Sequence, residues 1–580
     1  MTSLKKNLIT NYLLLVTLLF FGLFCSKGLF KEYGFATHDG DHHISRSFDA
    51  IQTLKEGHFP MRWAGSLNGW CGVPIFNFFY PLIYYLVFLV NFAVGDVINS
   101  LKIVASLSFI VGPMFFYLWL KCETKNKIAS FTGAFLYLFV PYRFLLVFVR
   151  FSPEFMAYTL LPILLWFISI LLEKLKKKIE LKTIVIAFVT SLIGGLFVIS
   201  HNFGVMLILP IIGLWTILKV IKEKIFSKEK LFLLIFVFIS FIGIGIFFIG
   251  PMLLEKQYVK LDTMRTMDYR DHFPTLSQLI RSPWDYGNSL SGTDRDGMSF
   301  MLGYAQWLVL GFVLFFLANY FLDKKKNKKL PVEIIYWFAL SSLSIFFILP
   351  WSKFIWDRIP ILQEIQFSWR FLGVTSFTIA ALAGFLLSKI KNKKIFYGLT
   401  LVFVSIAFYG NRNHLRIQQT PYPQKYINYE MNHDHRYATT SIFDDILNKK
   451  SKQMCLASAN MSPGMSIIFT PQVKDITLKT QRGNTFGKVS VDSPLEIEVS
   501  MRLSLEYFPG IYKIKFNGQE ISEINNCEGR VCLDGVKLIK GENVLEWKVG
   551  QSPTEKFFNW ISGGFLAVWV LIIIFAILLS

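Results

Sequence analysis

The sequence predicts a polytopic α-helical membrane protein of about 12 spans, with one re-entrant or interfacial helix and an extracytoplasmic β-sandwich-like domain near the C-terminus. Three observations support this fold class. The 580 residues are 53% hydrophobic with a mean hydropathy of +0.45, which is too apolar for a soluble chain of this length. Apolar runs recur along the first 410 residues, with short basic loops between them. A stretch before the last apolar run instead alternates apolar and polar residues, as β-strands do.

The apolar runs begin with residues 8–26, which follow the basic start "MTSLKKN" and have no small-x-small cleavage site after them. We therefore expect an uncleaved first span rather than a signal peptide. The other runs long enough to cross about 30 Å of hydrocarbon are 78–95, 101–120, 128–148, 155–173, 183–200, 203–218, 231–250, 304–322, 331–349, 369–388, 395–410 and 559–579.

Basic loops fix the expected orientation of these spans. "KCETKNK", "EKLKKKIELK", "KVIKEKIFSKEK", "DKKKNKK" and "SKIKNKK" fall between every second pair of runs and should be cytoplasmic. The same rule accounts for the net charge of +21 without a nucleic-acid partner. The basic N-terminus should also be cytoplasmic, so one early run must not cross. Residues 78–95, with a proline near their start and no basic flank, are the weakest span, and we expect them to lie along or dip into the outer leaflet.

The first outer loop, residues 27–100, contains the cluster "HDGDHHISR". Apolar residues from Ile44 to Leu54 then recur at helical spacing, with Asp39 or Asp41 as a candidate N-cap and Gly57 as a candidate stop. This pattern predicts a short amphipathic helix resting on the membrane surface, with the acidic cluster at its N-terminus.

Other outer loops carry ionisable residues at the membrane edge, where such groups indicate function by default. They are Arg143, Arg150, Glu154, His201, Glu255 and Arg370. Arg143 and Arg150 could instead snorkel to lipid headgroups, and a lone histidine such as His201 is more often structural. Glu154 has no such reach. Two acids could hold a divalent cation or act as a base, and arginines could bind a phosphate, so the set suits chemistry on a lipid-linked phosphate.

Residues 411–558 should form a mostly-β extracytoplasmic domain, and residues 559–580 a C-terminal transmembrane anchor. "EIEVSMRLSLEYFPGIYKIKFNGQEIS" alternates in polarity, and Asn517-Gly518 predicts a hairpin turn. Cys527 and Cys532 could bridge a hairpin or remain two free thiols. The domain could contact the outer loops, recognise an acceptor, or act as a rigid lid without chemistry.

Residues 1–410 are expected to form one transmembrane domain. Over about residues 8–410, and more weakly to the end, the chain resembles the C-fold class of integral-membrane glycosyltransferases, and most closely bacterial membrane proteins related to 6-pyruvoyl-tetrahydropterin synthase, neighbours of the YfhO-like proteins. The matching motifs are "HDG..H..R", "GHFP.RW", "G.P.F.FY.PL.YYL", "PY......VR...E", "SHN" and "QF.WRF". They correspond to His38-Asp39-Gly40 with His43 and Arg46, Gly57 to Pro60 with Arg62-Trp63, Pro74 to Tyr85, Pro141-Tyr142 to Glu154, Ser200 to Asn202, and Gln366 to Phe371.

The resemblance implies that Asp39 is the catalytic aspartate of the first loop and that Glu154 is the second acid. Together they could hold Mg²⁺ or Mn²⁺, although Phe151-Ser152-Pro153 before Glu154 departs from the Asp-x-Asp pattern of the wider class, which leaves the metal open. The residues expected to contact substrate are His38, His43, Arg46, Arg62, Arg143, Arg150, His201, Glu255 and Arg370.

The function so predicted is transfer of a sugar from a polyprenyl-phosphate donor to a glycan, lipid or protein acceptor, on the outer face of a bacterial cytoplasmic membrane. Asp39 would act as base or metal ligand, with Arg150 or Arg370 on the departing phosphate. The alternatives are a transporter or flippase for a lipid-linked glycan, and a non-catalytic envelope assembly factor. The lack of a glycine-rich loop after a strand argues against a nucleotide-sugar donor.

Overall fold

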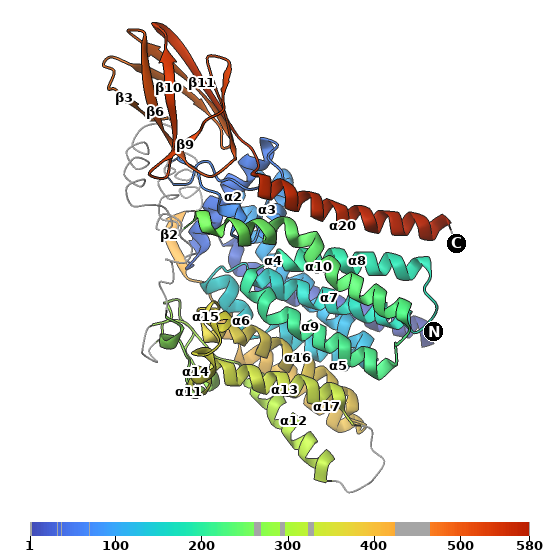
Figure 1. Cartoon of the computed structure of the whole chain (residues 1–580). Helices are drawn as coiled ribbons and strands as arrows, with labels where there is room; N and C mark the ends of the chain where they lie inside the picture. The colour runs from blue at the N-terminus through green and yellow to red at the C-terminus, as the bar shows by residue number, and fades with distance from the viewer. Residues whose placement is uncertain are drawn as a thin grey trace.

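The computed structural model describes residues 3–31, 33–35, 37–68, 70–259, 268–290, 296–322, 330–423 and 465–578. The part of the predicted outer domain between residues 424 and 464 lies outside these ranges. The described chain forms a bundle of long helices with a β domain projecting from one side (Figure 1).

Ten helices in the described residues are long and apolar enough to cross a membrane, and two bent helix pairs bring the total to twelve, as the hydropathy predicts. The ten are α1 (Ser3–Ser26), α4 (Val97–Thr124), α7 (Glu154–Leu175), α8 (Leu181–Val198), α9 (Asn202–Glu223), α10 (Lys228–Leu254), α12 (Tyr304–Leu322), α16 (Phe371–Lys389), α17 (Lys393–Gly410) and α20 (Pro553–Leu578). The bent pairs are α5 (Lys127–Leu138) with α6 (Pro141–Phe144) and a π-helical turn (Leu145–Val149), and α13 (Val332–Ile348) with Pro350–Ser352 and α14 (Lys353–Trp356).

Ion pairs bring several of the basic loops to the same end of the bundle. Lys219 lies 2.9 Å from Glu123, and Lys176 lies 3.1 Å from Glu223, so the ends of α4, α7 and α9 meet there. We call this the basic end, and both chain termini lie toward it (Figure 1). The opposite end, which we call the site end, carries α14, α15 (Pro360–Gln363), and the small sheet of β1 (Tyr33–Phe35) with β2 (Gln419–Pro423).

The run predicted not to cross the bilayer forms α3 (Leu82–Val94). Its 13 residues make a helix of about 20 Å, which is too short to span about 30 Å of hydrocarbon. The helix ends at Gly95, whose φ of 71° is left-handed. One face is buried and the other exposes Leu89 and Phe92, which fits a helix lying in the apolar border of the membrane.

The predicted amphipathic helix is α2 (Gly40–Lys55), with Asp39 at its N-cap and Gly57 just beyond its end. Its surroundings differ from the prediction of a helix resting on the membrane surface. Its buried face carries polar side chains as well as apolar ones: His43, Arg46, Ser47, Asp49 and Thr53. These polar residues are buried because α2 is covered by α3 and α4 on the bundle side and by the β domain, contacts that a hydropathy pattern cannot reveal.

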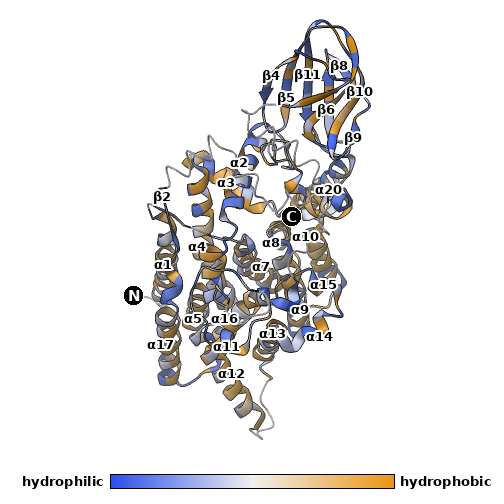
Figure 2. Ribbon diagram, turned by 90° about the vertical axis from the view of Figure 1, so that its left-hand side faces the viewer, coloured by the Kyte–Doolittle hydropathy of each residue, from blue (hydrophilic) through white to orange (hydrophobic). Residues whose placement is uncertain are grey.

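The β domain is a sandwich of two antiparallel sheets in the order β3-β6-β10-β9 and β4-β5-β11-β7-β8. The strands are β3 (Ile467–Thr470), β4 (Thr477–Arg482), β5 (Phe486–Ser493), β6 (Ile497–Glu506), β7 (Tyr512–Phe516), β8 (Gln519–Ile521), β9 (Asn525–Cys527), β10 (Arg530–Leu538) and β11 (Gly541–Val549). Asn517 and Gly518 form the expected turn with positive φ angles. A disulfide joins Cys527 to Cys532 across the β9–β10 hairpin, and Figure 2 shows apolar and polar residues alternating along the strands.

The β domain is built onto the first loop of the chain. Trp63 from that loop is 2% exposed and belongs to the apolar core of the sandwich, where its ring meets Tyr512. Asn484, in the β4–β5 hairpin, donates to the Asp49 carboxylate of α2 at 2.8 Å. The backbone N–H groups of Asn484 and Thr485 donate to the carboxylate of Glu56. The domain therefore holds the same helix whose N-terminus carries Asp39.

Candidate active site

Asp39 occupies the N-cap of α2, but its carboxylate does not cap the helix. Two backbone hydrogen bonds hold the segment in place, from His38 N to Val149 O at 2.9 Å and from Asp39 N to Arg150 O at 3.0 Å. Arg150 Nη2 lies 3.4 Å from Asp39 Oδ2. The Asp39 side chain is 31% exposed, so this carboxylate is ordered by one arginine and still open to a substrate.

The turn that presents Arg150 is unusual. A π-helical turn, Leu145–Val149, ends at Arg150, and Phe151 follows with a φ of 50°. A bulky residue in the left-handed region is strained, and such strain concentrates at functional sites. The following helix, α7, starts at Glu154, so the strained turn separates the two ionisable residues that the sequence singled out.

Glu154 is 1% exposed and lies deeper than Asp39. Its Oε1 accepts a hydrogen bond of 3.1 Å from the Tyr142 hydroxyl, and its Oε2 lies 4.0 Å from Arg370 Nε. A buried carboxylate is tolerated when it is paired and hydrogen-bonded in this way. Glu154 thus fixes Arg370 from behind, while the Arg370 guanidinium also lies over the Phe367 ring and donates to Ile365 O at 2.8 Å.

Two histidines predicted to contact substrate lie in the same cluster. His201 is the N-cap of α9 and accepts from Gly204 N, and its ring centre is 4.5 Å from that of Tyr80. Burial, with Arg370 and Arg150 nearby, holds the pKa of His201 well below its usual range. Burial and Arg46 do the same to the pKa of His43, so both rings are neutral at pH 7 and add no charge to the cluster.

Arg46 carries the third guanidinium of this cluster. It is 2% exposed and lies 4.2 Å from the centre of the Phe79 ring. Its Nε and Nη2 have no hydrogen-bond partner among the described residues. Burial, and after it the neighbouring Tyr84, raises the pKa of the Tyr80 hydroxyl. The charges of Arg46, Asp39 and Arg370 also influence this pKa. Tyr80 therefore marks the point where the groups from three loops meet.

The cluster contains three arginines and two carboxylates, so it has an excess of one positive charge when all are ionised. His38 lies at its border, where its Nε2 is 3.0 Å from Tyr286 O in the loop between α10 and α12. Aromatic rings of the 367–369 segment cover Arg150, with the Trp369 ring centre at 4.8 Å. A cationic, partly covered cluster beside one open carboxylate suits an anionic substrate with a group to deprotonate.

The residues do not fit a divalent cation well. Asp39 faces Arg150 and Glu154 faces Arg370, so each carboxylate already has a cationic neighbour. Within the described ranges, no group of three or more His, Cys, Asp or Glu could hold a metal ion. Magnesium and manganese prefer several oxygen ligands, which two arginine-paired carboxylates do not supply.

Two predicted contact residues, Arg62 and Glu255, belong to a different network. Asn77 donates to the carboxylates of Glu255, at 2.9 Å, and Glu555, at 2.6 Å, and Arg62 donates to Asn559 Oδ1 at 2.9 Å. This network joins the first loop to the ends of α10 and α20. In the described residues, no hydrogen bond or ion pair connects it to Asp39 or Glu154, and its hydrogen bonds hold the last helix to the first loop.

Arg143 also lies apart from the cluster. Its guanidinium points into the bundle, where Nη1 donates to Ser108 O at 2.6 Å and the Tyr137 ring centre is 4.3 Å away. Tyr80 and Tyr84, by contrast, lie in the cluster but were not singled out by the sequence. Their only signal was membership of the aromatic segment between Pro74 and Tyr85.

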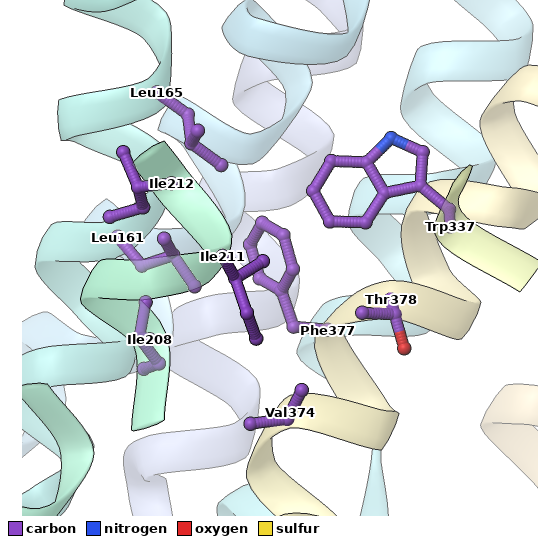
Figure 3. A pocket seen from close by; sticks show the side chains of 9 residues that line it. All are labelled: Leu161, Leu165, Ile208, Ile211, Ile212, Trp337, Val374, Phe377 and Thr378. Carbon is purple, nitrogen blue, oxygen red and sulfur yellow. The ribbon is translucent and has the colours of Figure 1, made fainter. Parts of the chain in front are cut away.

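The membrane-spanning helices also line an apolar cavity (Figure 3). It is lined by residues of α7, α9, α13 and α16: Leu161, Leu165, Ile208, Ile211, Ile212, Trp337, Val374, Phe377 and Thr378. No charged side chain reaches it, so it takes no part in the chemistry of the cluster.

The chain is thus a polytopic helical membrane protein with a carboxylate–arginine cluster at one end of its bundle and a β sandwich beside it. Solved structures that are similar to it include two of an oligosaccharyltransferase of Archaeoglobus fulgidus. One is tethered to an acceptor peptide, with a TM-score of 0.45 and 12% identity over 74% of this chain. The other, AglB with an inhibitory peptide and a dolichol-phosphate, gives 0.46 and 13% over 76%.

This chain spans 58% and 60% of those two chains, and at these scores the likeness does not bear on function. No protein-family model matches the chain, and no curated protein matches it. The two bacterial groups that its motifs resemble therefore find no support in these comparisons.

Proposed function

We propose that this protein is a glycosyltransferase that moves a sugar from a polyprenyl-phosphate donor to a hydroxyl acceptor at the non-cytoplasmic face of the membrane. The observation that carries the proposal is the Asp39 carboxylate. Asp39 is the N-cap residue of α2, but its carboxylate accepts no capping hydrogen bond. The side chain is 31% exposed and lies next to Arg150. A carboxylate kept available beside a cationic cluster is the arrangement that base-assisted displacement of a phosphate requires.

In the proposed reaction, Asp39 accepts the proton of the acceptor hydroxyl as its oxygen forms a bond to the anomeric carbon of the donor. The bond from that carbon to the phosphate oxygen breaks, and the phosphate keeps the electron pair. Arg46, Arg150 and Arg370 stabilise the negative charge that develops on the leaving phosphate. The proton on Asp39 then passes to water through the exposed side of the carboxylate.

Glu154 has a positioning role in this mechanism. It is buried behind Arg370 and holds that guanidinium through their 4.0 Å approach, while Tyr142 fixes the carboxylate. Replacing Glu154 with glutamine would leave the side-chain shape and remove the charge that orients Arg370. The proposed orientation places the basic end in the cytoplasm, since basic loops collect there, and leaves the cluster within reach of lipid-linked sugars outside.

The experiment uses the full chain in liposomes with a polyprenyl phosphate that carries one radiolabelled hexose, and a membrane glycolipid extract as acceptor. Asp39→Asn should lower transfer by about 10²- to 10⁴-fold, the usual effect of losing a general base. Asp41→Asn is the matched control, because Asp41 is an exposed acid in the first turn of the same helix. Equal transfer by Asp39→Asn and wild type, at equal protein in the vesicles, would overturn the proposal.

A further inference from the structure

The buried guanidinium of Arg143 lacks a compensating charge. Arg143 is 4% exposed and lies where α6 enters the bundle. Nη1 donates to Ser108 O in α4, but Nε and Nη2 have no hydrogen-bond partner among the described residues. No described carboxylate lies within ion-pair distance of it. A buried charge without a partner costs several kcal/mol, which natural structures usually offset.

A small cavity lies directly beside this arginine. Its volume is about 20 Å³, which is room for one water-sized particle. Arg143 shares the lining with Ser376 of α16, whose Oγ is also buried and without a hydrogen-bond partner among the described residues. The other lining residues come from α5, α7, α16 and the turns between them: Tyr137, Val140, Tyr142, Leu146, Phe155, Tyr158 and Gly373.

The unpartnered groups of Arg143 and Ser376 can both donate hydrogen bonds. Guanidinium N–H groups can only donate, and a serine hydroxyl can donate one hydrogen bond. An occupant that accepts several hydrogen bonds and carries one negative charge would satisfy Arg143 and Ser376 together. A single-atom halide is close to water in size and therefore fits this small cavity.

We propose that this cavity is a chloride-binding site that neutralises Arg143 inside the bundle. The ion would join α6 to α16 through Arg143 and Ser376. It would also lie behind Tyr142, whose hydroxyl donates to Glu154. This site is separate from the cluster around Asp39 and does not depend on the proposed reaction, because binding can be measured without any substrate.

The experiment measures thermal unfolding of the full chain in nanodiscs in sodium gluconate, with chloride or bromide added at constant ionic strength. A ligand that binds only the folded protein stabilises it in a saturable way. Wild type should melt at least about 2 °C higher in saturating chloride. Arg143→Met should lose this dependence, and Ser376→Ala should move the midpoint to higher chloride. Arg412→Gln, which removes an exposed arginine, should respond as wild type does.

A direct measurement covers the case in which Arg143→Met fails to fold. Bromide-soaked crystals of the wild type should give an anomalous peak between Arg143 and Ser376. A cavity that holds only water, shown by no bromide peak and by equal melting in gluconate and chloride, would overturn the proposal. Chloride-dependent melting that persists unchanged in Arg143→Met would overturn it as well.

Discussion

Asp39 shows how one residue can satisfy a sequence rule and still keep its side chain for another purpose. The sequence predicts an aspartate at the start of α2 because short polar residues favour N-caps. The structure places Asp39 at that position, but the carboxylate makes no capping hydrogen bond and instead faces Arg150. A cap is worth about 1 kcal/mol, so leaving it unmade is consistent with a functional use of the carboxylate.

Substitutions of Arg46 test whether the site needs only the positive charge of this side chain or also its planar shape. Its two unpartnered nitrogens form part of a planar fork. Arg46→Gln should lower kcat/KM for the polyprenyl-phosphate donor by about 10- to 100-fold, since a hydrogen bond to a charged group contributes about 1.5–3 kcal/mol. Arg46→Lys keeps the charge but not the planar fork, so it should restore only part of the lost kcat/KM.

The control for this prediction is Lys55→Gln, because Lys55 is an exposed cation on the same helix. It should transfer sugar at the wild-type rate. The role of Arg46 in phosphate binding is contradicted if Arg46→Gln keeps the wild-type kcat/KM at low salt, where electrostatic contributions are largest.

Helix α2 connects the β domain to the cluster at the scale of elements. The β4–β5 hairpin contacts Asp49 and Glu56 near the C-terminal half of α2, and Asp39 stands at the other end of the same rigid helix. Gly65 contributes to this contact, because a Cβ there would come within 2.1 Å of the Asn484 carbonyl oxygen. The domain therefore acts as a support for the site, in addition to any contact with an acceptor.

Asp49 makes this support sensitive to pH. Burial raises its pKa to about 6 from an ordinary 3.8, although hydrogen bonds from Ser66 and Asn484 oppose the rise. The folded state thus binds this proton more tightly than the unfolded chain does. The stabilising contribution is full below about pH 4 and is lost as the pH rises through 6; its size is about 3 kcal/mol.

We therefore expect the free energy of unfolding of the wild-type β domain to fall as the pH is raised from about 4 to 7. The Asp49→Asn variant, which has no carboxyl at this position, should lack this part of the fall. Hydrogen exchange of the β4–β5 hairpin across this range measures the difference. Asp492→Asn removes an exposed aspartate of β5 and should keep the wild-type slope. Identical pH slopes for Asp49→Asn and wild type would show that Asp49 does not titrate in this window.

For the whole molecule, the orientation in the membrane is the central prediction. Cysteines introduced at exposed positions report it, after Cys25 and Cys122, which are not in disulfides, are replaced by serine. Lys540→Cys in the β domain should react with a membrane-impermeant maleimide in intact cells. Lys391→Cys, at the loop between α16 and α17, should react only after lysis. The reverse pattern would place Asp39 in the cytoplasm and exclude a donor that is presented outside.

The helical layout was predictable because crossing a bilayer leaves a direct mark on hydropathy. All twelve predicted spans correspond to helices or bent pairs, and residues 78–95 contain only the short α3. The polar contacts were less predictable, because they join residues far apart in sequence. Arg62 and Glu255 meet through Asn77, which also contacts Glu555, almost 480 positions further on. No local pattern distinguishes such an anchor from a substrate contact.

The insertion of Trp63 into the β sandwich has a consequence for biogenesis. The first loop is synthesised long before the strands that surround Trp63, with about 400 residues between them. At translation rates of about 5–20 residues per second, that loop waits roughly 20 to 80 s before its partner exists. Throughout this interval α2 lacks the cover that the β domain provides, and the Asp49 carboxylate lacks its partner Asn484. The first loop thus reaches its final arrangement only after the last strand of the β domain, β11, has been synthesised.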